Sequence, residues 1–82
     1  MASKAKKSAD KPQYEMIIRW SDVDEAYVVF LPEFTSLNQP CTHGDTYEQA
    51  VRRARKIVES MIAIYREDGV PLPTPHKYSP AA

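Results

Sequence analysis

Three groups of residues in this sequence carry side chains that could take part in chemistry. In the first, Cys41 and His43 lie two positions apart, so on a strand they would share one face, as a thiol nucleophile and its base do. An activated pair also needs a third group that orients the imidazole, and the neighbouring residues supply none. A lone cysteine is more often a small buried apolar residue. We therefore predict no catalytic residue and no enzymatic activity.

The second group is acidic and consists of Asp22, Asp24 and Glu25. A nuclease of the ribonuclease H type needs several carboxylates that converge on two Mg²⁺ ions, and the preceding strand offers few partners for these three. A calcium loop would require a glycine and a distal bidentate glutamate, which are absent at the right spacing. We predict a solvated turn that could attract a basic partner protein, with no metal site and no cofactor.

The third group is basic and could bind nucleic-acid phosphates. Its members are Arg52, Arg53, Arg55 and Lys56. Glu48 stands four positions before Arg52, and Glu59 four positions after Arg55, so ion pairs are expected to neutralise part of this charge. Exposed aromatic residues that could stack on bases are not interleaved with the group. A solvated helix face is the favoured interpretation, and RNA or DNA binding by these residues and the Lys-rich N-terminus is the alternative.

Two short apolar segments predict the strands that would carry the acidic group. Residues 14–20 alternate, with Tyr14, Met16, Ile18 and Trp20 on one face. Residues 26–31 are rich in β-branched and aromatic side chains and are expected to pair back as a hairpin. Pro32 ends the second strand because it has no N–H to donate. A short third strand is expected around residues 41–43, followed by a turn at residues 44–45.

A long amphipathic helix is predicted from Tyr47 to about Glu67. Thr46 and Gln49 have the spacing of a capping box at its start, and Gly69 is placed to end it with a positive φ. Ile64 lies apart from the apolar stripe, where it could widen that stripe or mark a contact with a partner. The stripe itself comprises Tyr47, Ala50, Val51, Ala54, Ile57, Val58, Met61, Ile62 and Tyr65. The predicted fold class is α+β, a three-stranded antiparallel sheet with one long helix on one face.

The length of 82 residues allows one domain, which we place at residues 13–70. Residues 1–12 are predicted to be a disordered basic tail, and residues 71–82 a Pro-rich extended tail with a possible short strand. So small a core is marginal alone, and one cysteine permits no internal disulfide. We therefore expect a homodimer or a higher homo-oligomer, or a stabilising partner.

Charge and hydropathy limit the possible partners and locations. The formal net charge is zero, so no strong field points to nucleic acid. No apolar run is long enough to cross a membrane, and no apolar signal segment follows the N-terminal lysines. The expected location is a reducing cytoplasm, without a membrane partner.

The order of these segments resembles the HicB-like antitoxin family. The matching residues are Tyr14, Trp20-Ser21-Asp22, Tyr27-Val28-Val29, Pro32-Glu33-Phe34, Cys41-Thr42-His43-Gly44-Asp45-Thr46-Tyr47-Glu48-Gln49-Ala50 and Gly69-Val70-Pro71-Leu72-Pro73. The loop from Phe34 to Cys41 is a few residues longer than the family's compact Leu-Pro-Gly-Cys. Many family members also carry a C-terminal DNA-binding domain, for which a chain that ends at Ala82 has no room.

The resemblance implies a truncated ribonuclease H-like fold and a non-enzymatic function. Members of this family bind HicA toxins, small proteins that cleave messenger RNA, and neutralise them by covering the active surface. The expected partner is therefore a HicA-like toxin, and binding to operator DNA is not expected. The residues expected to contact it lie at the end of the second strand and in the adjoining loops. They are Tyr27, Pro32, Glu33, Phe34 and Asp45.

Overall fold

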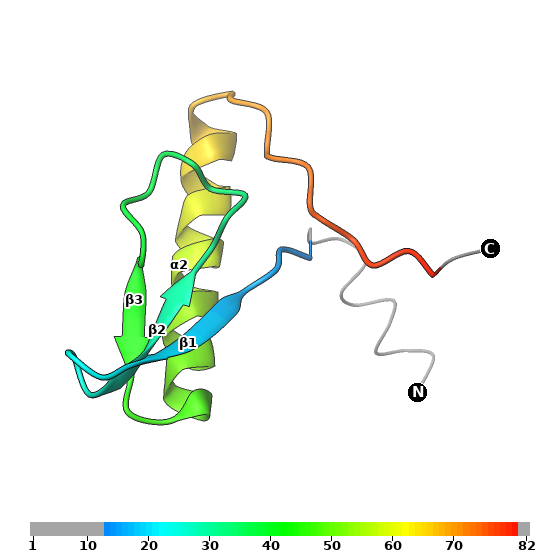
Figure 1. Cartoon of the computed structure of the whole chain (residues 1–82). Helices are drawn as coiled ribbons and strands as arrows, with labels where there is room; N and C mark the ends of the chain where they lie inside the picture. The colour runs from blue at the N-terminus through cyan, green and yellow to red at the C-terminus, as the bar shows by residue number, and fades with distance from the viewer. Residues whose placement is uncertain (1–12, 81–82) are drawn as a thin grey trace, which may run out of the picture.

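The computed structural model describes residues 13–80, which form three strands and one helix. The elements in chain order are β1 (Ile17–Ser21), β2 (Ala26–Phe30), β3 (Thr42–Gly44) and α2 (Tyr47–Glu67). The strands make one antiparallel sheet in the order β1-β2-β3, and α2 lies across one face of it (Figure 1). The predicted α+β fold is therefore confirmed.

Predictions were made for both terminal segments, and most of the C-terminal one lies within the described residues. The predicted disordered tail falls on residues 1–12, outside the described residues. Residues 70–80, hereafter the C-terminal strap, run without helix or strand and lie beside Tyr14 and Glu15 (Figure 1). The prediction of a possible short strand in this segment was wrong. The prolines hold the segment extended but remove N–H donors that strand pairing needs. No helix within residues 13–80 is both long and apolar enough to cross a membrane.

The β1–β2 hairpin sets which side chains face α2. Ile18 pairs with Val29 and Trp20 with Tyr27, and these residues point toward the helix side of the sheet. The turn between the strands is held by the Ser21 hydroxyl, which accepts a hydrogen bond from the backbone N–H of Asp24 at 3.2 Å. The acidic group thus occupies the hairpin turn, as predicted.

The core lies between β2, the loop after it and α2. Two alanines of α2 are fully buried, and their small side chains let the helix approach the sheet closely. Each large apolar side chain in such a core contributes roughly 1.5–3 kcal/mol. The fully buried cluster consists of Val29, Leu31, Phe34, Ala50 and Ala54.

Two aromatic residues assigned to the apolar face are in fact exposed. Trp20 is 52% exposed and Tyr47 is 59% exposed. Trp20 is the penultimate residue of the edge strand, and Tyr47 is the first residue of α2, so both extend past the end of the core. They flank Tyr27, whose ring contacts Trp20 edge-on and lies 4.3 Å from that of Tyr47, centroid to centroid. The result is an aromatic row at the surface.

Both ends of α2 are capped by the residues that the sequence indicated. The Thr46 hydroxyl accepts from the N–H of Gln49 at 3.1 Å, and the Gln49 carboxamide accepts from the N–H of Asp45, one residue earlier than in a standard capping box. At the other end Gly69 has a φ of 68°. The N–H of Val70 reaches the Tyr65 carbonyl, which completes a Schellman motif and directs the chain into the strap.

Candidate functional site

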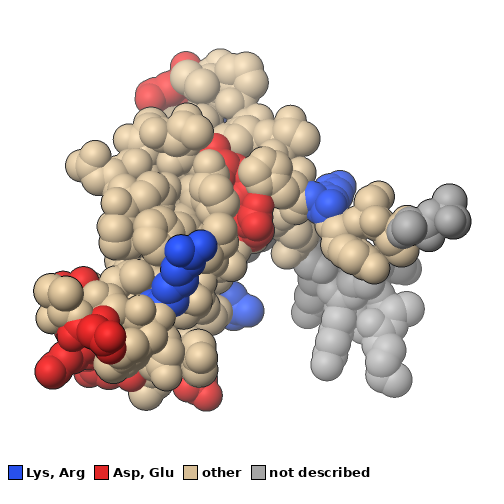
Figure 2. All heavy atoms as spheres, viewed as in Figure 1, with Lys and Arg blue, Asp and Glu red and all other residues tan. Residues whose placement is uncertain are grey.

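The face of the sheet opposite α2 has no helix over it within residues 13–80. Because side chains alternate along each strand, the register places Ile17, Arg19, Val28, Phe30 and His43 on this side, hereafter the open face. Figure 2 views it directly: uncharged atoms predominate, and acidic side chains gather at the hairpin turn. On the open face Ile17 and Phe30 are half-buried and Val28 is buried, whereas Arg19 and His43 are exposed, and the acidic residues lie at one end.

A groove crosses the open face near the end of β2. It is lined by Ile17, Arg19, Phe30, Pro32 and Gln39. The Arg19 guanidinium carbon lies 5.9 Å from the centroid of the Phe30 ring, within the range of a cation–π contact. This groove offers a partner an aromatic ring, aliphatic surface and one positive charge.

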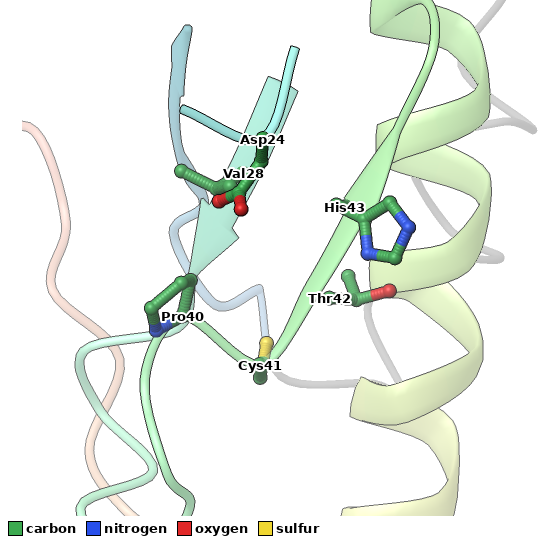
Figure 3. Close-up of a pocket in the computed structure, with 6 residues that line it drawn as sticks. All are labelled: Asp24, Val28, Pro40, Cys41, Thr42 and His43. Carbon is green, nitrogen blue, oxygen red and sulfur yellow. The ribbon is translucent and has the colours of Figure 1, made fainter. Parts of the chain in front are cut away.

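A second hollow of about 370 Å³ lies between the hairpin turn, β2, β3 and the loop leading into β3 (Figure 3). It contains Cys41 and His43, the pair considered as a possible nucleophile and base. The Cys41 thiol donates to the Val29 carbonyl, and burial raises the pKa of this thiol. A nucleophilic cysteine needs the opposite shift, toward the thiolate. The raised pKa therefore disfavours Cys41 as a nucleophile.

The residues expected to contact a toxin separate into two groups at opposite ends of β2. Tyr27 lies opposite Gly44, next to the exposed Asp45, at the start of β2. Past its end, Pro32 lines the groove of the open face, whereas Glu33 and Phe34 are buried, Phe34 completely. Of the second group only Pro32 presents a side chain to a partner in this conformation, and Phe34 positions the loop from inside.

The basic residues of α2 all lie exposed on the helix. Within residues 13–80, the expected ion pairs of Glu48 with Arg52 and of Arg55 with Glu59 do not form, so that prediction was wrong. Arg52 and Arg55 instead line a shallow hollow with the exposed Tyr47. The prediction that no aromatic residue accompanies this group was also wrong, because Tyr47 begins the helix beyond the core. The other two residues of the basic group are Arg53, which donates a hydrogen bond to the His43 carbonyl, and Lys56.

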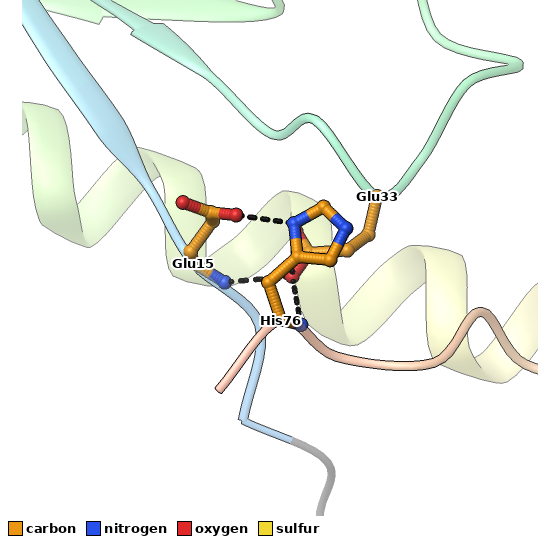
Figure 4. A group of neighbouring side chains, drawn as sticks. All are labelled: Glu15, Glu33 and His76. Carbon is orange, nitrogen blue, oxygen red and sulfur yellow. Dashed lines mark hydrogen bonds and ion pairs between the residues drawn. The ribbon is translucent and has the colours of Figure 1, made fainter. Parts of the chain in front are cut away.

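A further cluster, absent from the predictions, joins three segments that are distant in sequence. Glu15 precedes β1, Glu33 follows β2, and His76 lies in the C-terminal strap, with the three side chains facing one another (Figure 4). The carboxylate of Glu33 accepts from the backbone N–H of His76 at 2.8 Å, and His76 Nδ1 is hydrogen-bonded to Glu15. The Tyr14 hydroxyl also donates to the Pro73 carbonyl at 2.7 Å. These bonds attach the strap to the domain.

The cluster changes the protonation of the His76 imidazole. The hydrogen bond with Glu15 is the main cause that raises the pKa of His76 above 6.5. Burial acts in the opposite direction, and the charges of Glu33 and Glu15 each add a smaller effect that raises this pKa. A folded-state pKa above the unfolded value means that the protonated ring strengthens docking below about pH 6.5. That contribution is lost as pH rises through the folded-state pKa.

We expect docking of the strap to weaken progressively as pH rises above about 6.5 in metal-free buffer, because the contribution of the protonated His76 ring is lost. Amide resonances of residues 70–80 should shift toward disordered-chain positions in an NMR titration, while those of β2 and α2 stay in place. In Glu15→Gln the transition should occur at lower pH, because the neutral amide no longer favours the imidazolium. An unchanged His76 titration in that variant would contradict the assignment.

Comparison with known proteins leaves the family unassigned. The chain matches no protein-family model, no curated protein and no solved structure. The function is therefore argued from the surfaces described above and from the residue pattern.

Proposed function

We propose that this chain is a HicB-type antitoxin-like module that binds a small HicA-type toxin, masks its RNA-cleaving surface and performs no chemistry itself. The observation that carries the proposal is the groove of the open face, which Ile17, Phe30 and Pro32 line with apolar surface. Binding by such a groove needs shape and apolar contact, not reactive groups. The β-β-β-α order that the family resemblance implied is also the order of elements in the structure.

The charge distribution suits this partner. A toxin that binds RNA presents a basic surface, and the acidic turn of Asp22, Asp24 and Glu25 adjoins the open face. The turn would accelerate and orient the encounter, while the groove supplies the contact area. In the same way, self-association through the open face would produce the expected homodimer, in a cytoplasmic setting.

Co-expression with a HicA-like protein encoded by a neighbouring gene is the direct test. The toxin alone should arrest growth, the wild-type chain should restore growth, and a stable complex should be isolated. Phe30→Asp should abolish rescue because it places a charge in the groove. Ile64→Asp is the matched control, since Ile64 is 48% exposed but lies on α2, away from the groove.

Two outcomes would oppose the proposal. If the neighbour stays toxic beside the wild-type chain and no complex is isolated, the antitoxin function fails. If Ile64→Asp abolishes rescue and Phe30→Asp preserves it, the partner binds the helix and the open face is the wrong surface. Size-exclusion chromatography of both variants without the toxin shows whether Phe30→Asp also abolishes the homodimer.

A second candidate function, binding of single-stranded nucleic acid, is favoured by one observation. Tyr47 is exposed beside Arg52 and Arg55 and continues the aromatic row of Trp20 and Tyr27. Stacking on a tyrosine contributes about 1–3 kcal/mol per base, and the arginines would hold the backbone. This surface is separate from the open face, so the two functions can be tested independently.

An RNA oligonucleotide titration followed by Trp20 fluorescence tests this candidate. Quenching should weaken steeply with salt, and Tyr47→Ala should lower the affinity by about tenfold, in line with the loss of one stacked base. Arg66→Ala, at the far end of α2, is the control. Equal affinity of the Tyr47→Ala variant and the wild type would exclude this surface.

A further inference from the structure

The cluster of Glu15, Glu33 and His76 has the composition of a metal site. The three residues offer two carboxylates and one imidazole, and one ligand atom from each lies within 4.8 Å of the others. We propose that this cluster binds a divalent transition-metal ion of the zinc class and that the bound ion clamps the C-terminal strap to the domain. The proposal is independent of toxin binding.

The spacing of the ligand atoms fits a small tetrahedral ion. Atoms that bind one tetrahedral zinc at about 2.0–2.1 Å lie about 3.3 Å from each other. The Nδ1 atom of His76 and Oε2 of Glu33 are 3.7 Å apart. In the metal-free arrangement Glu15 is hydrogen-bonded directly to Nδ1, so a small outward movement of this half-exposed carboxylate would admit the ion.

An unsatisfied carboxylate oxygen gives an independent reason for a cation here. The side chain of Glu33 is 1% exposed, and Oε2 is occupied by the backbone N–H groups of Glu15 and His76. The other oxygen, Oε1, is buried and has no hydrogen-bond partner among residues 13–80. A buried carboxylate with an unpartnered oxygen is costly, and a cation bound to this carboxylate would neutralise its charge.

Charge balance and ligand type indicate the class of ion. Two carboxylates with a neutral imidazole carry a charge of −2, which a divalent cation cancels. The imidazole nitrogen favours zinc and its neighbours over Mg²⁺ and Ca²⁺, which prefer oxygen. The His76 side chain is 63% exposed, so water can reach the ion and fill a fourth position.

The three ligands come from three separate segments, and this gives the ion a structural role. Glu15 belongs to the start of the domain, Glu33 to the loop after β2, and His76 to the strap (Figure 4). Hydrogen bonds hold the strap in the metal-free state, and coordination would replace the pH-dependent bond between His76 and Glu15 with a stronger link. Metal binding and strap docking should therefore be coupled.

Calorimetric titration of Zn²⁺ into the untagged, chelator-treated chain at about pH 7.5 tests the proposal. We expect one saturable equivalent in the wild type, and binding at least about tenfold weaker in His76→Ala and in Glu33→Gln. His43→Ala removes the other histidine and should bind as the wild type does. Because His76 lies in the strap, outside the core, its variant should keep the wild-type circular dichroism spectrum and so report on binding alone.

A second measurement distinguishes this site from adventitious binding elsewhere. One equivalent of Zn²⁺ should shift the ring resonances of His76 and the amide resonances of residues 70–80 in NMR spectra. The proposal is overturned if the wild type shows no saturable equivalent, if His76→Ala binds within about twofold of the wild type, or if His43→Ala loses the same affinity.

Discussion

Replacing Gly44 with alanine is expected to prevent stable folding. A Cβ atom at this position would lie 2.4 Å from the backbone nitrogen of Ala50 and 2.8 Å from its Cα, so it would collide with the main chain of α2. Overpacking usually costs about 1–3 kcal/mol. A Cβ atom that collides with the helix backbone, which cannot move aside as a side chain can, belongs at or above the upper end of this range. A domain of this size has only roughly 3–10 kcal/mol of stability. Urea denaturation followed by circular dichroism should show a greatly lowered midpoint or no folded baseline.

Gly69→Ala is the matched control for this prediction. Nothing lies within 4 Å of a Cβ placed there, and the substitution is unfavourable only because the φ of 68° strains an alanine. We expect a loss of about 1 kcal/mol, the usual cost of the left-handed conformation. Equal denaturation midpoints for the two variants would mean that β3 and α2 do not approach as closely as described.

Replacing Phe34 with alanine should have the second large effect. The ring is fully buried and makes edge-on contacts with Tyr14 and Tyr65, at centroid distances of 4.7 and 5.9 Å. Removing such a ring costs about 3–5 kcal/mol, because the cavity collapses only in part. The loop after β2, which carries Glu33 and the groove residue Pro32, should lose its shape as well. Thermal denaturation of Phe34→Ala and wild type measures the loss.

Phe30→Ala is the control for Phe34→Ala, because it also removes a phenylalanine ring, but from the open face. We expect a smaller loss of stability and a direct loss of partner binding, whereas any loss of binding in Phe34→Ala should follow from unfolding. If Phe34→Ala stays as stable as wild type and still fails to bind, the aromatic ring would have to contact the partner directly, as the sequence had suggested.

The local features of the fold were predictable because their causes are local. The alternation of apolar and polar residues predicted the hairpin. Thr46, Gln49 and Gly69 predicted both ends of the helix, since each cap depends on residues a few positions apart. The periodicity of apolar residues shows on which face of a helix or strand a residue lies. It does not show how far along that face the buried core extends. This is why Trp20 and Tyr47, at the ends of their elements, were wrongly assigned to the core.

The Glu15–Glu33–His76 cluster could not be predicted in the same way. Its hydrogen bonds span 18, 43 and 61 positions along the chain, and nothing in a local pattern specifies which loops meet. Glu33 stands between Pro32 and the core residue Phe34, and its carboxylate is itself buried. The open face was predictable once the strands were placed, but the exposure of its groove depends on how the loop after β2 folds back.

The hydrogen bonds of the C-terminal strap close the chain into a loop, and this bears on the order in which the molecule opens. The bond from Tyr14 to Pro73 joins positions 59 apart, whereas the sheet and the helix depend on much shorter separations. Closing so long a loop is entropically unfavourable, so the strap is expected to dock last in folding and to open first. In native-state hydrogen exchange, the His76 amide should therefore exchange through a low-energy local opening. The Cys41 amide, bonded to the Val29 carbonyl in the core, should exchange only when the whole domain unfolds.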